Sequence, residues 1–471
     1  MTDRIIIKKG LDLPIGGAAE KRLTDASFIA TYAVKPTDFV GLQPRLQVAE
    51  GDNVAAGGVL FTDKNDERIR FTSPVTGTVK AIVRGEKRKL LAVVVERDGD
   101  YQASAFAGTS PKELMLESGL WTLLRQRPFG TVPSPDSKPK AIVISCFDSA
   151  PLAPDYDFAL QGREDDFVKG LDLLATLTEG TVHLCFRPGQ SLLKRFSTLN
   201  TSPDSGPRFS IHEVAGPHPA GNIGTLIARL CPINKGEQVW TMNPQDIATL
   251  GHLARTGEYR PERILAVAGP SARNPHYYRT LMGACVESLV NGQLSNPSYP
   301  LIENQPCHGV RIVSGNILSG EAIAPDGFLG AYDSLLSLLP EGDHYDLLGW
   351  LMPGLKKYSF SRTFLSGILH DLLPKTLNSQ LSTLNFFDTN VHGSVRPLVF
   401  TGNFERVFPF DIYPLQLLKA CIIGDVELQE KLGIYEVEPE DFALCEFIDT
   451  SKTDIQPIVR EALEKLRKET L

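Results

Sequence analysis

The sequence has no two cysteines close enough to share a metal ion through a local motif. Its seven cysteines are an odd number, and the nearest pair, Cys285 and Cys307, is 22 residues apart. Iron–sulphur clusters and structural zinc sites instead use Cys-x-x-Cys pairs, which place two thiolates on one metal. Such locally built sites are therefore excluded, and buried free thiols are the simpler interpretation. The cysteines are Cys146, Cys185, Cys231, Cys285, Cys307, Cys421 and Cys445.

Long apolar runs are also missing. A membrane-spanning helix needs about 20 consecutive apolar residues, and the nearest candidate, residues 335–355, is broken by Pro340-Glu341-Gly342-Asp343. The chain starts with Ile5-Ile6-Ile7 followed by Lys8-Lys9, without an apolar segment of signal-peptide length. The sequence therefore predicts a cytoplasmic protein that does not span a membrane.

Basic stretches with interleaved aromatic residues, which nucleic-acid-binding proteins need, are absent too. The net charge is −8, and residues 424–454 hold ten acidic residues against only Lys431 and Lys452. We therefore expect no nucleic acid as a partner. The acidic window 424–454 is interpreted as a solvated surface, with a site for a basic partner as the alternative.

A compact β pattern is present between Val48 and Val83. Apolar residues recur there with period two, and glycines stand where a tight barrel needs them. The pattern predicts a β barrel-sandwich of the kind that carries lipoyl or biotinyl groups. A carrier holds its group on a lysine at the hairpin tip, but Lys64 is off centre and Asn65-Asp66 occupy the expected tip. We expect a barrel without cargo that serves in docking, and keep a carrier role for Lys64 as an alternative.

The chain is too long for a single core, and its patterns predict a mixed α/β, multidomain fold. Helices are expected over residues 111–124, 164–176 and 243–255, and a proline-rich linker over 127–139. Five segments are predicted: residues 1–105 as the barrel-sandwich region, 106–210 as a Rossmann-like α/β domain, 211–310 as a small β-grasp-like (SLBB-type) segment, 311–395 as a further β/α segment with a polar Ser/Thr/Asn-rich loop at 377–389, and 396–471 as a helical domain.

Nucleotide-binding glycines are not found where an α/β domain would place them. The turn after the predicted strand 141–146 contains Asp148 and no glycine, so it would repel phosphate. The glycine-rich stretch 216–224 has neither dinucleotide-binding nor Walker A spacing and predicts a rigid turned loop. His212 and His218 flank Glu213 at a spacing seen in some metal sites, although ordinary hydrogen bonds are the simpler interpretation.

Five blocks along the chain resemble the NqrA family, the A subunits of the bacterial Na+-translocating NADH:quinone reductase. They are Lys8–Gly17, Gly41–Pro44, Ala215–Gly221, Phe404–Pro414 and Glu440–Cys445. This family is similar to the flavin subunit of respiratory complex I and to the C subunit of Rnf complexes. The resemblance implies an enzyme fold that kept its architecture and lost its cofactor sites, since the glycine-rich flavin loop and the cluster cysteines of those relatives are missing.

The resemblance further implies a subunit without a cofactor, docked on the cytoplasmic side of the bacterial inner membrane. FMN, riboflavin, FAD and a [2Fe-2S] cluster are then expected in the partner subunits (B to F), of which the membrane-embedded B subunit is the main contact. No catalytic, cofactor-binding or metal-binding residue is expected in this chain. The alternative is a flavin-dependent NADH dehydrogenase subunit with a divergent flavin loop.

Two proline-containing loops are the candidates for contact with quinone or a partner. One contains Phe129 and Gly130, and the other contains Pro217, His218 and Pro219. Prolines fix a backbone at low entropic cost, and Phe129 offers an aromatic face. Packing of Phe129 between domains remains an equal alternative.

Overall fold

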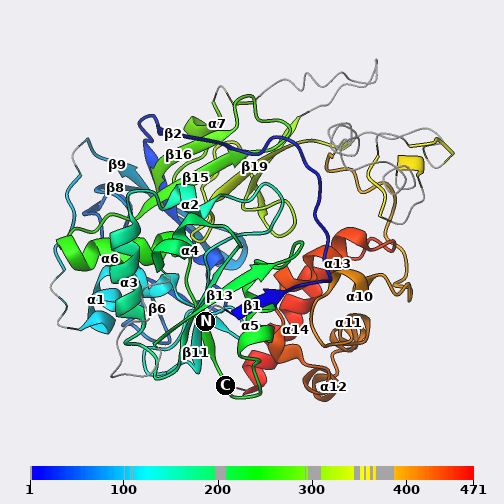
Figure 1. The fold of residues 1–471 in the computed structure, drawn as a ribbon. Coiled ribbons are helices and arrows are strands. Elements are labelled where there is room, and N and C mark those ends of the chain that lie inside the picture. The colour runs from blue at the N-terminus through cyan, green and yellow to red at the C-terminus, as the bar shows by residue number, and fades with distance from the viewer. Residues whose placement is uncertain are drawn as a thin grey trace.

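The computed structural model describes residues 3–470 except 100, 107, 109, 197–207, 292, 295–308, 344–348, 350, 355–356, 361–363 and 367–386. Within these residues the strands form two six-stranded sheets and a small two-sheet barrel, followed by a helical C-terminal part (Figure 1). The mixed α/β prediction is confirmed. None of the helices in the described ranges is long and apolar enough to cross a membrane.

The predicted barrel-sandwich forms between residues 31 and 97. One sheet has the order β3-β9-β8-β5 and the other β4-β6-β7. Alternation places Val79, Val93 and Val95 inside the barrel, and the rings of Phe61 and Phe71 stack with centroids 4.7 Å apart. The strands are β3 (Thr31–Val34), β4 (Pro44–Leu46), β5 (Asn53–Val54), β6 (Val59–Asp63), β7 (Arg70–Thr72), β8 (Gly77–Arg84) and β9 (Leu90–Arg97).

The first six-stranded sheet belongs to the α/β domain and has the order β1-β13-β12-β11-β14-β10. All neighbouring strands are parallel except β10 and β14. These parallel strands confirm the predicted βαβ unit. The strands are β1 (Asp3–Ile6), β10 (Arg125–Arg127), β11 (Ala141–Ser145), β12 (Val182–Phe186), β13 (Phe209–Ala215) and β14 (Val239–Thr241).

Helices cover both faces of this sheet. On one face, α3 (Glu164–Leu174) and α6 (Pro244–Thr256) pack over Ile142 and Ile144, and on the other α5 (Ile223–Leu230) packs over Val143. α6 begins as predicted, because the side chain of Asn243 accepts a hydrogen bond from the amide of Gln245 and proline follows it. A Cβ at Gly251 would overlap the carbonyl oxygen of Asp166, so glycine lets α3 and α6 approach closely.

Three features of the first two units differ from the sequence prediction. The boundary at residue 210 falls inside the first sheet, because β13, α5, β14 and α6 continue the α/β domain. The first residues leave the barrel region, because β1 pairs with β13. The helix expected over 111–124 is shorter: α1 (Pro111–Ser118) ends at Gly119, whose φ of 79° is left-handed, and residues 120–123 form a separate 3-10 turn.

The second six-stranded sheet has the order β18-β17-β19-β15-β16-β2. Its edge strand β2 comes from the N-terminal segment and runs parallel to β16. The strand signals after residue 311 are therefore correct, but β17 to β19 join the sheet of β15 and β16 and do not form a separate layer. The strands are β2 (Glu20–Asp25), β15 (Glu262–Ala268), β16 (His276–Leu281), β17 (Val310–Ser314), β18 (Glu321–Ile323) and β19 (Leu335–Pro340).

The C-terminal part is helical, as predicted. Its last helix, α14, buries Val459, Leu463 and Leu466 on one face, which follows the predicted apolar spacing. Most of the polar loop predicted at 377–389 lies outside the described residues. The helices are α10 (Phe404–Val407), α11 (Pro414–Ile423), α12 (Val426–Lys431), α13 (Ala443–Ile448) and α14 (Ile455–Thr470), with the 3-10 turns η4 (Ile434–Glu436) and η5 (Pro439–Phe442).

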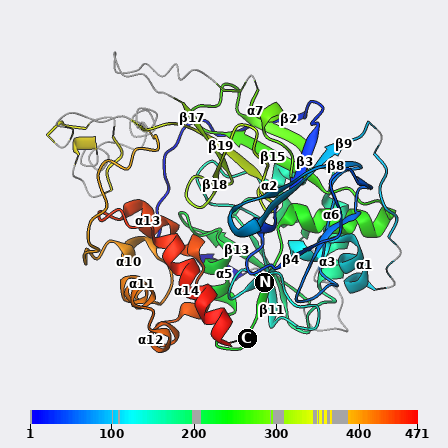
Figure 2. The ribbon, with the colours of Figure 1, turned by 180° about the vertical axis from the view of Figure 1, so that it is seen from behind.

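The α/β domain lies between the barrel and the C-terminal helices. Both views place β8 and β9 on one side of the molecule and α10 to α12 on the other, with β11 and β13 between them (Figures 1 and 2). The C-terminal helices pack beside β1 and α5, where Arg229 of α5 donates to the carbonyl of Pro409 at 3.0 Å. This packing brings the C-terminal part to the end of the parallel sheet.

Candidate functional site at the carboxyl end of the parallel sheet

Open α/β sheets bind ligands at the carboxyl ends of their strands. Here the loops after β11 and β13 and the segment after β1 meet at that end. Oγ of Ser149 and Nδ1 of His218 are 3.1 Å apart, and Oγ of Ser149 also accepts the amide of Gly221 at 2.8 Å. The carboxylate of Asp12 accepts the amide of His218 at 2.8 Å. The three segments thus hold one another by hydrogen bonds within the chain.

The first turn of α5, which follows the loop after β13, packs against a carboxylate of the chain itself. A Cβ at Gly224 would overlap both carboxylate oxygens of Asp441, which belongs to η5. The amino end of such a helix is the position at which dinucleotide-binding domains hold phosphate. The side chain of Asp441 thus packs against Gly224 in the first turn of α5, close to the region where such domains hold phosphate.

A buried charge cluster surrounds Asp441. Arg127 of β10 forms an ion pair with Glu440 and lies 3.5 Å from Oδ2 of Asp441. Arg460 of α14 contacts Glu438 at 2.7 Å. We call these five residues the junction cluster: Arg127, Glu438, Glu440, Asp441 and Arg460. The cluster holds three carboxylates and two guanidinium groups, and it joins the α/β domain to the C-terminal helices.

Burial sets the ionisation of the junction. It raises the pKa of Asp441 to about 7, and the neighbouring carboxylate of Glu440 adds to the rise. Burial also acts on Glu440, but the guanidinium groups of Arg127 and Arg125 hold the pKa of Glu440 below its usual range. Burial lowers the pKa of His218 to about 4, so its imidazole is neutral near pH 7. A phosphate placed here would meet the carboxylate of Glu440, whose lowered pKa keeps it ionised near pH 7.

Both loops that the sequence singles out lie at this junction. Phe129 is 9% exposed and its ring packs edge-to-face with Tyr435, with centroids 6.3 Å apart. A Cβ at Gly130 would lie 3.1 Å from a carboxylate oxygen of Glu438. The loop between β13 and α5 contains Pro217, His218 and Pro219. The negative charge of Glu440 acts on the imidazole of His218 and partly offsets the lowering of its pKa by burial. The structure thus brings the two loops together on either side of the junction cluster.

The sequence does not predict the charged members of the cluster. Glu438, Glu440 and Asp441 belong to the acidic window 424–454, which we interpret from the sequence as solvated, but Glu438 and Asp441 are only 3% and 2% exposed. That interpretation is wrong for these two residues, because tertiary packing buries them at the junction with the α/β domain. The sequence feature that could have pointed to them is the block Glu440–Cys445, which resembles the NqrA family and contains Glu440 and Asp441.

His212 and His218 each make an ordinary side-chain contact, which is the simpler interpretation of the sequence. Nε2 of His212 lies 3.0 Å from Nδ1 of His183, whereas His218 contacts Ser149, so the two histidines do not converge. No group of three or more candidate ligands arranged for a metal occurs in the described part of the chain. The six cysteines in that part are buried free thiols, in agreement with the prediction.

Lys64 is exposed in the hairpin between β6 and β7, and its amide donates to the carbonyl of Gln43 at 2.7 Å. Lys64 comes directly after Asp63, the last residue of β6, and is therefore not at the centre of the turn. This placement is that of a solvated hairpin lysine and agrees with the off-centre position read from the sequence.

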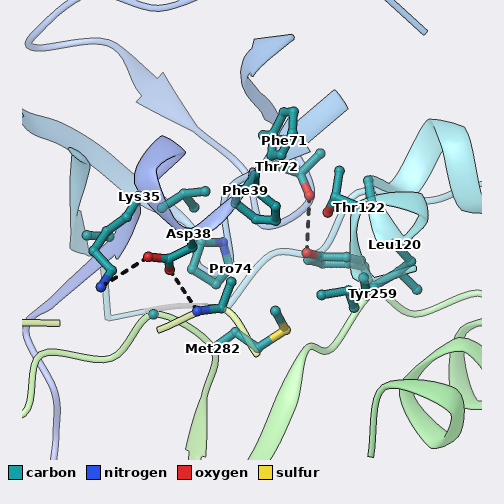
Figure 3. A pocket seen from close by; sticks show the side chains of 16 residues that line it. Lys35, Asp38, Phe39, Phe71, Thr72, Pro74, Leu120, Thr122, Tyr259 and Met282 are labelled. Carbon is teal, nitrogen blue, oxygen red and sulfur yellow. Dashed lines mark hydrogen bonds and ion pairs between the residues drawn. The ribbon is translucent and has the colours of Figure 1, made fainter. Parts of the chain in front are cut away.

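A second polar junction lies where the barrel, the α/β domain and the second sheet meet (Figure 3). Nζ of Lys35 is 3.2 Å from Asp38, whose carboxylate also accepts the amide of Ala331 at 2.8 Å. The hydroxyl groups of Thr72 and Tyr259 lie 3.1 Å apart on the opposite wall. The partly open cavity has about 50 Å³, whereas sites for small organic ligands have roughly 300–1,000 Å³. The cavity accommodates water and not a flavin ring.

Comparison with known proteins first defines the class. Family models match three consecutive parts of the chain: an NqrA N-terminal barrel-sandwich hybrid domain at residues 5–98, an NqrA second alpha/beta domain at 108–259, and an NQRA C-terminal domain of the SLBB type at 264–324. The chain is therefore a multidomain α/β protein with barrel-sandwich and SLBB-type domains. The family model that matches residues 108–259 spans β13 and β14, and these strands also belong to the first six-stranded sheet.

Full-length relatives then give the family. The chain is 38% identical to the A subunit of the Na(+)-translocating NADH-quinone reductase of Yersinia pseudotuberculosis, with 99% of this chain and 100% of the relative covered. The same subunit of Vibrio anguillarum is 37% identical and that of Histophilus somni 38%, at the same coverage. The chain belongs to the NqrA family, the A subunits of the Na+-translocating NADH-quinone reductase.

Solved structures add little. An NAD+-reducing [NiFe]-hydrogenase covers 50% of this chain and 48% of its own, with 14% identity and a TM-score of 0.34. This similarity is too low to support an argument about the site.

Proposed function

We propose that this chain is a cofactor-free subunit on the cytoplasmic side of the NADH-quinone reductase complex. It is bound to the membrane-embedded subunits, chiefly the B subunit, by protein contacts alone. NADH oxidation, quinone reduction and sodium transport then depend on FMN, riboflavin, FAD and a [2Fe-2S] cluster in the partner subunits. This chain contributes a preformed surface and does not catalyse the reaction by itself.

One observation carries the proposal. The carboxylate of Asp441 packs against Gly224, in the first turn of the helix whose amino end would bind the phosphate of a nucleotide, and glycine is needed there to admit that carboxylate. A bound flavin or dinucleotide would have to displace Asp441 and place its phosphate beside Glu440. Both steps are unfavourable, because a like charge in a buried site is poorly screened. The same contacts argue against the alternative of a flavin-dependent NADH dehydrogenase subunit with a divergent loop.

Cell fractionation tests the attachment. With all partner subunits present, the chain should sediment with the membranes. Without the membrane-embedded subunits it should remain in the supernatant, because its net charge of −8 opposes binding to an anionic leaflet. If the chain still sedimented with washed membranes and needed detergent for release, the proposal would have to be abandoned.

The contribution of Phe129, Gly130 and Pro217-His218-Pro219 to quinone or partner contact is a finer part of the proposal. Burial of Phe129 and His218 favours a role in which the two loops orient the C-terminal helices for partner contact. Photo-crosslinking of the assembled complex with a quinone analogue distinguishes the two roles. Labelling of either loop supports quinone contact, and labelling confined to partner subunits supports orientation alone.

A further inference from the structure

Within the five residues of the junction cluster the carboxylates outnumber the guanidinium groups three to two, and Arg125 of β10, outside the cluster, also acts on Glu440. When the members of the cluster are all ionised, the carboxylates of Glu438, Glu440 and Asp441 face the guanidinium groups of Arg127 and Arg460. Arg460 binds Glu438 at 2.7 Å and Arg127 binds Glu440. Asp441 is left with only the 3.5 Å contact to Arg127. The excess negative charge therefore resides mainly on Asp441.

Among the described residues, the carboxylate of Asp441 accepts only one hydrogen bond. Its side chain is 0% exposed, and one of its oxygens, Oδ2, accepts the amide of Glu438 at 2.9 Å. The other oxygen, Oδ1, has no hydrogen-bond partner, and neither has Oε1 of Glu438. A buried carboxylate with an unsatisfied oxygen is unfavourable. One proton on Asp441 removes its negative charge from the buried site.

Among the members of the junction cluster, Asp441 is the one whose charge changes near neutral pH. Its own turn η5 contributes Glu438 and Glu440, and α14 contributes Arg460. Charged groups from the other packed elements are Arg125 and Arg127 of β10, Asp148 and His218 of the loops after β11 and β13, and Asp12 of the N-terminal segment. α5 presents Gly224 to the carboxylate. Burial raises the pKa of Asp441 to about 7, while His218 stays neutral.

We propose that Asp441 is a proton-operated latch that holds the C-terminal helices against the α/β domain. In its protonated form Asp441 packs as a neutral group against Gly224, and the remaining carboxylates and arginines are balanced two to two. Loss of the proton leaves an uncompensated anion inside the junction, and the C-terminal helices loosen from α5. The latch consists of residues of this chain alone.

The sign of the pH dependence follows from the raised pKa. Between the ordinary aspartate range and about pH 7, the folded junction holds a proton that the opened form releases. The latch is therefore complete at low pH and weakens as the pH rises toward 7, after which the loss is constant. A single proton changes the opening equilibrium by at most about tenfold per pH unit.

Hydrogen–deuterium exchange of the α13 and α14 amides in the full chain measures this opening. After correction for intrinsic exchange, the opening constant of the wild type should rise by up to about tenfold per pH unit between about pH 5 and about pH 7 and then level off. Asp441→Asn, which mimics the protonated form, should remove this slope. Asp425→Asn is the matched control, because Asp425 is exposed on the same domain and asparagine can also cap α12. It should behave as the wild type.

Two results would overturn the latch: an equal slope in the wild type and Asp441→Asn, or no slope in either. If Asp441→Asn does not fold, Glu440→Gln provides the second test. It removes the neighbouring negative charge and frees Arg127 for Asp441, so the pH step must move to lower pH. A step that stays in place in Glu440→Gln contradicts the proposal.

Discussion

Arg263 of β15 and Asp246 of α6 form an ion pair of 2.7 Å in which the side chains are 0% and 2% exposed. Arg263 also donates to the carbonyl of Ala331 at 3.1 Å. The pair joins the α/β domain to the second sheet within a shared apolar core. These two units therefore meet through a buried polar contact of fixed geometry, which orients one relative to the other.

Removing one partner of this pair should be costly. Arg263→Ala leaves the carboxylate of Asp246 buried without its counterion, and we expect a loss of about 3–5 kcal/mol in the free energy of unfolding. Urea unfolding of the full chain measures it. Arg260→Ala is the matched control, since Arg260 is half-exposed and contacts Glu262 at 3.5 Å. Its cost should be below about 1 kcal/mol. Equal costs for the two variants would show that the buried pair has no special role.

Gly224→Ala tests the position of Asp441 against α5. Alanine is normally better than glycine in a helix by about 1 kcal/mol, but here the added Cβ would overlap the carboxylate of Asp441. We expect a net destabilisation of about 1–3 kcal/mol, as for other overpacked sites. Asp441→Ala in the same chain should recover part of it. Gly99→Ala, where a Cβ meets no atom within 4 Å, is the control. A Gly224→Ala chain as stable as the wild type would contradict this placement.

Asp38 should make the stability of the second polar junction, where the barrel, the α/β domain and the second sheet meet, depend on pH. Burial raises its pKa to about 6, in spite of the ion pair with Lys35. Its contribution to stability is therefore complete below the ordinary aspartate range and is lost as the pH rises to about 6. The stability difference between the wild type and Asp38→Asn should change by at most about 1.4 kcal/mol per pH unit in this interval and be constant above it. A difference independent of pH would mean that Asp38 is ionised throughout.

Lys64→Ala should have little effect. An exposed hairpin lysine contributes within about 0.5 kcal/mol to stability, and turnover of the assembled complex should be unchanged. Lys80→Ala, in β8 of the other sheet of the barrel and also exposed, serves as the control. An adduct of lipoyl or biotinyl mass on Lys64 in the intact-mass spectrum would instead establish a carrier role.

The sequence predicts the local elements better than their assembly. The barrel strands, the start of α6 at Asn243 and the apolar face of α14 follow from period and capping, which are local properties. The true extent of the α/β domain beyond residue 210 escapes such reasoning because β13 belongs to a sheet formed with β1, more than 200 residues away. Period-two alternation predicts that a strand exists, but it does not predict which sheet the strand joins.

The junction cluster shows the same limit for the site. Arg127 and Glu440 are 313 residues apart, and the sequence shows them only as a linker residue and as a member of an acidic window. The rigidity of their loops singles out Phe129 and His218. The carbonyl of Phe129 accepts a hydrogen bond from Arg460, and the imidazole of His218 is influenced by the charge of Glu440. Local chemistry thus identifies the loops, whereas the charges that define the junction depend on tertiary packing.

The flavin and iron content of the full chain, purified under native conditions without its partners, tests the central claim most directly. The proposal predicts no flavin absorbance, no iron and no NADH oxidation, because Asp441 packs against the first turn of the helix whose amino end would hold a nucleotide phosphate and the chain lacks clustered cysteines. Addition of FMN should leave its fluorescence unchanged. Stoichiometric flavin or iron bound to the purified chain would contradict the account.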